Sequence, residues 1–142
     1  MPNTNIEELI LAIFSTSRLI REHTENREGL NPFSFFQLET LRYVAKKNNP
    51  SMKNIANYLC ITPPSATSLI NRLVKVKQIE RTKDKCDRRL VRLVITPKGK
   101  KALGSGLKKI VKQMRKVLSC LSKKERVDLI AILQNLSQTY SK

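Results

Sequence analysis

The sequence is poor in several residue types, and each shortage argues against a class of protein. It has no tryptophan, four glycines and a single histidine in 142 residues. That histidine, His23, has no carboxylate pair, nucleophile elbow or glycine-rich phosphate loop to accompany it. We therefore expect a protein that is not an enzyme and that uses no cofactor.

Cysteines and long apolar runs are also scarce. Cys60, Cys86 and Cys120 form an odd set without the spacing of a metal site, so we expect reduced thiols and no metal. No apolar run is long enough to cross a membrane, and no signal peptide opens the sequence. These absences predict a soluble, cytoplasmic protein.

Acidic residues are few, and the resulting positive charge is concentrated in one part of the chain. The whole sequence has 28 Lys and Arg against 11 Asp and Glu. Residues 72–116 hold seventeen basic and three acidic side chains, a net charge of +14, whereas residues 1–71 have a net charge of +1. A local excess of this kind favours a polyanionic partner. A solvated helix face is the alternative for the cluster at residues 108–116.

The stretch that follows Thr62 has the features of a DNA-reading helix. Thr62 is a good N-cap and Pro63 a good first helical residue. Apolar residues at helical spacing form one face: Ala66, Leu69, Ile70 and Leu73. The other faces carry small hydrogen-bonding side chains and one cation: Ser65, Thr67, Ser68, Asn71 and Arg72. Such a surface suits the major groove, which admits a helix and offers donors and acceptors.

The neighbouring segments predict a winged helix-turn-helix. A capping box at Ser34 and Gln37 predicts a helix to about Lys47, and Ser51 caps a short helix before the turn to Thr62. After the DNA-reading helix, β-branched runs at residues 79–81 and 90–96 flank a basic tip at 83–89 and predict a hairpin. Two short helices, a tight turn and a hairpin make the motif.

Longer helices are expected on both sides of this unit. Residues 5–25 have an amphipathic pattern, followed by a connector at 27–33. Thr96-Pro97 begins another helix, in which the glycines at 104 and 106 predict a kink or a break. Ser122 and Glu125 form a capping box for the last helix.

The apolar stripes of the first and last helices have no obvious partner in the central unit, so we interpret them as a dimerisation layer. The alternative is that they cover the core of one monomer. The expected fold is mainly α with a small β hairpin, a winged helix-turn-helix with N- and C-terminal dimerisation helices. Its segments are 1–33 (helix and connector), 34–96 (DNA-binding) and 97–142 (C-terminal dimerisation helices).

Three motifs, in the right order, resemble the MarR-type transcriptional regulators. They are Ile79-Glu80-Arg81, Asp87-Arg88-Arg89 and Ile95-Thr96-Pro97-Lys98-Gly99, and the resemblance extends from about Ile6 to Tyr140. It implies a homodimer that binds a pseudo-palindromic operator in double-stranded DNA. Family members commonly release DNA when a small aromatic or phenolic molecule binds, so the resemblance also implies such an effector. Repression is the default expectation, because a dimer across a promoter blocks polymerase with no further contact.

The resemblance also implies which residues touch DNA. The recognition helix would be residues 62–76, with these side chains at the DNA: Thr62, Pro63, Pro64, Ser65, Thr67, Ser68, Asn71 and Arg72. The wing would contribute Arg81, Lys83, Lys85, Asp87, Arg88 and Arg89. Arg89 would enter a narrow minor groove, where negative potential is enhanced, and Asp87 would position it. Lys77 stands where the family usually has glycine, so the helix is expected to end differently here.

Two other functions stay open at this point. Cys86 lies among cations that favour the thiolate, which would make the protein a redox-responsive regulator. The plainer interpretation is that Cys60 and Cys120 are small core residues and Cys86 is merely tolerated. A sequence-tolerant architectural nucleic-acid-binding protein would use the same charge without reading bases. No aromatic residue interleaves the basic stretch, which argues against stacking on single strands.

Overall fold

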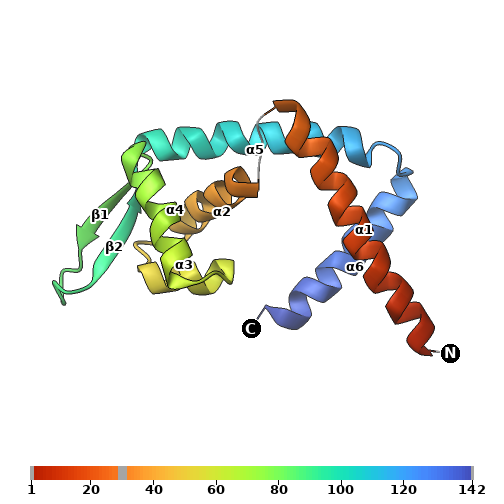
Figure 1. Cartoon of the computed structure of the whole chain (residues 1–142), viewed down its shortest axis with the longest axis horizontal. Helices are drawn as coiled ribbons and strands as arrows, with labels where there is room; N and C mark the ends of the chain where they lie inside the picture. The colour runs from red at the N-terminus through yellow and green to blue at the C-terminus, as the bar shows by residue number, and fades with distance from the viewer. Residues whose placement is uncertain (1, 29–31, 142) are drawn as a thin grey trace.

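The computed structural model describes residues 2–28 and 32–141, with side chains for residues 5–23 and 35–141. Its elements in chain order are α1 (Pro2–Glu28), α2 (Pro32–Lys46), α3 (Met52–Leu59), α4 (Pro63–Lys75), β1 (Ile79–Lys83), β2 (Val91–Ile95), α5 (Pro97–Leu118) and α6 (Lys123–Tyr140). A lobe of α2–α4 and the hairpin lies beneath one end of α5, and α1 and α6 lie toward its other end (Figure 1). The predicted fold class is confirmed. Among the described helices, none has the length and hydrophobicity needed to cross a bilayer.

The lobe is held together by one apolar core. Its buried members come from α2, α3, α4 and both strands: Leu41, Val44, Ile55, Ile70, Leu73, Ile79 and Leu93. Ala66, Leu69, Ile70 and Leu73 are all buried, so the apolar face predicted for α4 is confirmed. Ala102 and Leu103 of α5 pack against the same core, which fixes the start of α5 to the lobe.

The hairpin is antiparallel, with Ile79 opposite Ile95 and Lys83 opposite Val91. Its second strand also pairs with the chain that precedes α3, where the amide of Leu93 donates to the carbonyl of Pro50 at 2.9 Å. A bridge between Ser51 and Arg92 continues this contact. The wing is therefore anchored at its base on two sides.

Lys77 corrects one expectation. It adopts φ 62°, the left-handed conformation expected of the glycine usual at this position, so α4 ends in the ordinary way. The amide of Gln78 donates to the carbonyl of Leu73, and the amide of Lys77 donates to the carbonyl of Val74. This pair of hydrogen bonds is the Schellman motif that commonly ends a helix. The carbonyl of Lys77 then accepts a 2.6 Å hydrogen bond from the Thr96 hydroxyl, which holds the strained residue in place.

The expected kink or break at the glycines of α5 is wrong, because the helix is continuous from Pro97 to Leu118 (Figure 1). Packing explains Gly106, where a Cβ atom would lie 2.2 Å from Cδ2 of Leu38. Gly99 has a similar role at the start of the helix, where a Cβ atom would lie 2.1 Å from the Gln78 carbonyl oxygen. These glycines allow close approach of α5 to the lobe instead of interrupting it.

The start of α2 also differs from expectation. The helix begins at Pro32, so Ser34 lies inside it and the predicted Ser34–Gln37 capping box is wrong. Proline suits the first turn of a helix because its missing amide would have no partner there. Of the predicted connector, residues 27 and 28 belong to α1, and residues 29–31 lie outside the described part of the chain.

The apolar faces of α1 and α6 are left open by the monomer. Ile6, Leu9 and Ile13 of α1 are each more than half exposed, and α6 contains no buried residue. The alternative that these helices cover the core of a single monomer is therefore wrong.

Candidate nucleic-acid interface

The outer face of α4 is polar and accessible along its whole length. Each of the predicted contact residues from Thr62 to Arg72 is exposed, while the apolar residues between them are buried. The face is held rigidly, because the buried side is part of the core. What the chain presents here is a set of short hydroxyl, amide and proline side chains on a fixed helix.

The first turn of α4 leaves no backbone amide for an anion. Pro63 and Pro64 have none, and the amide of Ser65 donates to the Thr62 hydroxyl at 3.3 Å. The amide of Ala66 is bonded to the carbonyl of Thr62. Helix N-termini commonly hold phosphates through such amides. Here any phosphate contact near this end depends on side chains.

A hydrogen bond connects Asn71 and Arg81, in which the Arg81 guanidinium donates to the side-chain oxygen of Asn71. This contact connects the first strand of the wing to the middle of α4. It orients two of the predicted DNA-contacting residues toward each other and restricts the freedom of both.

The turn at the wing tip is organised by Asp84, which sequence reasoning did not single out. Its Oδ1 accepts from the amides of Cys86 (2.7 Å) and Asp87 (3.1 Å), and its Oδ2 accepts from Nε of Arg92 at 2.7 Å. An aspartate that bonds amides two and three residues ahead is a turn signal readable from sequence. Its partner across the hairpin, Arg92, is not readable in that way.

These hydrogen bonds lower the pKa of Asp84. The bond from Arg92 is the largest cause, followed by the amides of Cys86 and Asp87, and together they bring the pKa to about 2 from 3.8. All three contacts favour the ionised carboxylate. The wing is thus built around an anion that stays charged at any physiological pH.

Asp87 holds Arg89 beside it at the tip. Oδ1 of Asp87 accepts from the Arg89 amide at 3.0 Å and from its Nε at 3.3 Å. The Arg89 side chain nevertheless remains 92% exposed, so the guanidinium is oriented without being buried. Lys83, Lys85 and Arg88 are exposed around it, and no ion pair involves them within the described residues.

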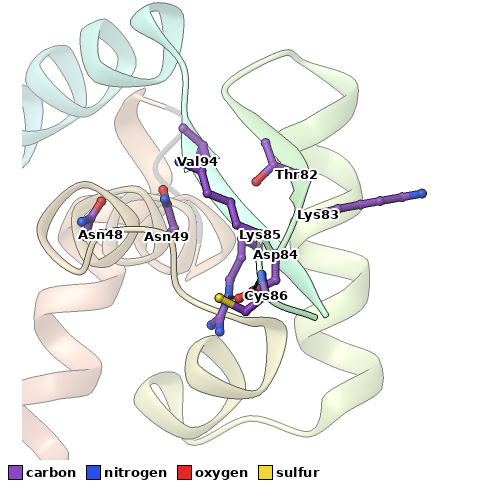
Figure 2. Close-up of a pocket in the computed structure, with 9 residues that line it drawn as sticks. Asn48, Asn49, Thr82, Lys83, Asp84, Lys85, Cys86 and Val94 are labelled. Atoms are coloured by element: carbon purple, nitrogen blue, oxygen red, sulfur yellow. Dashed lines mark hydrogen bonds and ion pairs between the residues drawn. The ribbon is translucent and has the colours of Figure 1, made fainter. Parts of the chain in front are cut away.

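An open hollow of about 740 Å³ separates the wing from the turn between α2 and α3. Figure 2 shows Asn48 and Asn49 on one side, the hairpin residues on the other and Lys83 extending away from them. Asp84 and Cys86 are among its lining residues. The hollow is open to solvent.

All three cysteines are exposed, so the interpretation of Cys60 and Cys120 as core residues is wrong. Cys60 is the C-cap of α3 and has a left-handed backbone conformation, with φ 54°. Within the described part of the chain, no three His, Cys, Asp or Glu side chains lie close enough to hold a metal ion.

Residues 35–91 match the sequence model of the MarR family. This segment of the chain is similar to the MarR family. The matched segment begins in α2 and ends at the first residue of β2, so it contains the polar face of α4 and the whole wing tip.

Solved structures extend the likeness beyond that segment. YusO from Bacillus subtilis is 23% identical, with a TM-score of 0.67 over 97% of this chain and 98% of its own. The regulator BldR from Sulfolobus solfataricus is 22% identical, with a TM-score of 0.69 over 96% of both chains. A MarR family protein from Bacillus stearothermophilus is 18% identical, with a TM-score of 0.72 over 99% and 96%. No match was found among curated protein sequences.

The matched segment therefore sits in a chain whose whole fold, α1 and α6 included, is similar to that of a solved MarR family protein. At these identities the neighbours establish the architecture, and the roles of individual residues must be argued from the contacts above.

Proposed function

We propose that the protein is a sequence-specific, DNA-binding transcriptional regulator that acts as a homodimer on a pseudo-palindromic operator. The observation that carries this proposal is the pairing of two surfaces on one rigid lobe. One is the exposed polar face of α4, and the other is the wing tip on which Asp87 orients Arg89. The first suits base edges in a major groove, and the second suits an adjacent minor groove.

In this proposal each residue group has a distinct role. Pro63, Pro64, Ser65, Thr67 and Ser68 face the bases, and Arg72 lies nearer to phosphate. Because Asn71 is bonded to Arg81, we assign this pair to positioning the wing against α4 as well as to DNA contact. Lys83, Lys85 and Arg88 add sequence-independent attraction to the backbone.

Dimerisation is supported by the open apolar faces of α1 and α6. We assign residues 34–96 to DNA binding, and residues 1–33 and 97–142 to the dimer interface. Pairing of two copies removes from water side chains such as Ile13 and Leu133, which are 52% and 54% exposed in one copy. A two-fold dimer presents two α4 helices, and operator symmetry then mirrors protein symmetry.

We assign the regulator to repression in the cytoplasm, with release by a small aromatic or phenolic effector and without catalytic activity. A dimer across a promoter blocks polymerase with no further contact. Phe35 and Phe36 support the assignment of an aromatic effector, because their rings are exposed near the beginning of α2 and could contact an aromatic ligand. A panel of phenols and aromatic acids, tested for a rise in Tm and for loss of DNA binding, checks this assignment.

Selection from a randomised duplex pool tests the proposed function. We expect an inverted repeat to emerge, bound by two chains, and we expect Arg89→Ala and Ser65→Ala to lower its affinity relative to random DNA. Each lost base contact is worth about 1–3 kcal/mol of discrimination. Glu80→Ala, a change in the first strand of the wing outside the predicted contacts, is the matched control.

The sequence-tolerant architectural alternative gives the opposite pattern. Under it, no consensus emerges, and Arg89→Ala weakens all duplexes equally with a smaller salt dependence.

Cys86 supports a narrower variant in which oxidation controls DNA binding. Its thiol is exposed and its amide donates to Asp84, so a bulky oxidised sulfur would disturb the turn that orients Arg89. Peroxide should then weaken operator binding in the wild type and leave Cys86→Ser unaffected. An equal loss in both proteins removes this variant.

A further inference from the structure

One face of α5 carries a stripe of positive charge that the proposed DNA-reading surface does not use. Its members recur at helical spacing along almost the whole helix: Lys98, Lys101, Lys108, Lys112 and Arg115, flanked by Lys109 and Lys116. All of these side chains are exposed. At 1.5 Å per residue the stripe is about 27 Å long.

The stripe lies on the side of α5 that is turned away from the lobe. Gly99 and Gly106 mark the side that packs on the lobe, since Cβ atoms there would meet Gln78 and Leu38. At 100° per residue, Lys101, Lys108 and Arg115 lie more than a third of a turn from those glycines. A duplex bound to this stripe is therefore not the duplex that α4 and the wing contact.

The partly exposed apolar residues of α5 occupy a third face. Leu107, Val111 and Leu118 remain between 37% and 53% exposed and continue the open surface of α1 and α6. A second copy of the chain covers this apolar face. The basic stripe borders this apolar face, and Lys98, Lys101 and Lys112 lie roughly a quarter of a turn or more from its residues.

Nothing on α5 neutralises the stripe. The helix contains eight basic residues and no acidic one. Within the described part of the chain, no ion pair involves any of the stripe residues. Like charges at i,i+4 destabilise a helix, so the arrangement costs stability that a polyanion would recover.

The chemistry of the stripe fits duplex phosphate better than other polyanions. It is mostly lysine, which binds phosphate as a point charge without directional demands. It has no aromatic side chain on which single-stranded bases would stack. The apolar residues that a membrane-surface helix would insert lie on a different face, which the dimer covers. A straight row of cations matches a rigid duplex, which offers one charge per about 1.7 Å.

We propose that the α5 stripe binds the phosphate backbone of a second segment of double-stranded DNA, so that one dimer bridges two duplexes. The binding is independent of sequence. This inference goes beyond the proposed function, since it does not depend on base reading by α4. Its consequence is that a dimer bound at one site also holds flanking or distant DNA against α5.

Energy transfer between two duplexes tests the bridging. Donor-labelled and acceptor-labelled short duplexes of random sequence are mixed with the full-length protein at about 0.1 M salt. The test variant is Lys108→Gln/Lys112→Gln/Arg115→Gln. The matched control is Lys123→Gln/Lys124→Gln/Arg126→Gln in α6, which removes the same charges from another exposed helix.

We expect the wild type and the control to produce transfer and the stripe variant to need roughly tenfold more protein. Loss of three phosphate contacts also lowers the slope of log affinity against log salt by about 3. Affinity for one short duplex of the selected sequence should stay within threefold in the stripe variant. Circular dichroism and Tm of the variants confirm that all are folded.

Four results overturn the inference. Transfer is absent in the wild type, or it is equal in the stripe variant, or it is lost equally in the control. The fourth is an equal loss of single-duplex and bridging affinity in the stripe variant, which would place the stripe on the same duplex as α4.

Binding to phosphatidylserine vesicles that depends on the stripe, without bridging of duplexes, assigns the stripe to a membrane surface instead. If the selection for an inverted repeat fails while bridging persists, only the proposed base reading is lost.

Discussion

At the residue scale, the wing depends on a single carboxylate. Asp84 accepts two backbone amides and the Arg92 guanidinium, and these bonds lower its pKa to about 2. The later residues of the wing tip, Arg89 included, follow a turn that this aspartate closes. A change at Asp84 should therefore act on DNA binding although its side chain is turned toward the wing itself.

We predict that Asp84→Asn weakens DNA binding nearly as much as Arg89→Ala while leaving α-helical content unchanged. An amide keeps one acceptor for the loop but removes the charged partner of Arg92. Fluorescence anisotropy with a labelled duplex measures the affinity. Wild-type affinity in Asp84→Asn would show that the turn forms without the carboxylate.

Asp84 also predicts a pH dependence. Because its pKa is lowered in the folded state, the stability it contributes is fully present above pH about 4, its value in the unfolded chain. That contribution declines as the pH falls toward 2, where the folded group takes up a proton. Urea unfolding between pH 5 and pH 2.5 should show the difference between wild type and Asp84→Asn shrinking over this interval. A difference that does not change with pH would contradict the assignment.

Lys77 offers a stabilising substitution. A lysine at φ 62° is strained relative to glycine, so Lys77→Gly should raise the free energy of unfolding by about 0.5–1 kcal/mol after the entropy of the unfolded glycine is counted. Lys77→Ala removes the same charge and keeps the strain, so it should bring no gain. Chemical denaturation of the two variants separates conformation from charge.

At the element scale, two glycines of α5 should respond in opposite ways to alanine. Gly99→Ala places a methyl group against the Gln78 carbonyl and should cost about 2 kcal/mol or more. A Cβ atom at Gly104 would meet nothing within 4 Å, so Gly104→Ala should stabilise the helix by about 1 kcal/mol. Equal effects in thermal or urea unfolding would contradict the tight junction at the start of α5.

The same elements show which features can be read from sequence. The caps at Ser51, Thr62, Thr96 and Ser122 were predicted correctly, because a cap is a contact among residues three apart. The break at Gly104–Gly106 was wrong, because the reason for a glycine at 106 is Leu38, a residue of another helix. The turn made by Asp84 is a local signal that sequence reasoning overlooked, whereas its ion pair with Arg92 could not be read from sequence because Arg92 lies across the hairpin.

Residue roles at the DNA stay predictions. The sequence predicts the wing arginine and its aspartate through family resemblance, and the structure adds their hydrogen bonds. The contact between Asn71 and Arg81 could not be predicted, because it depends on how the wing leans on α4.

At the scale of the whole molecule, the account requires a dimer. We predict that Ile13→Glu together with Leu133→Glu yields a monomer, because each substitution puts a charge into the apolar surface that two copies share. Ser15→Glu, about half a turn from Ile13 on the same helix, should leave the dimer intact. Sedimentation equilibrium at micromolar concentration distinguishes the two outcomes. A wild type that sediments as a single chain would contradict the prediction.

The central claim is that this chain reads duplex DNA by sequence through two joined lobes. The most direct measurement is the ratio of its affinity for the duplex selected from a random pool to its affinity for a shuffled duplex of equal length and composition. At near-physiological salt we predict a ratio of about 10³ or more, falling sharply in Arg89→Ala. A ratio near one, or no binding to either duplex, would contradict the account.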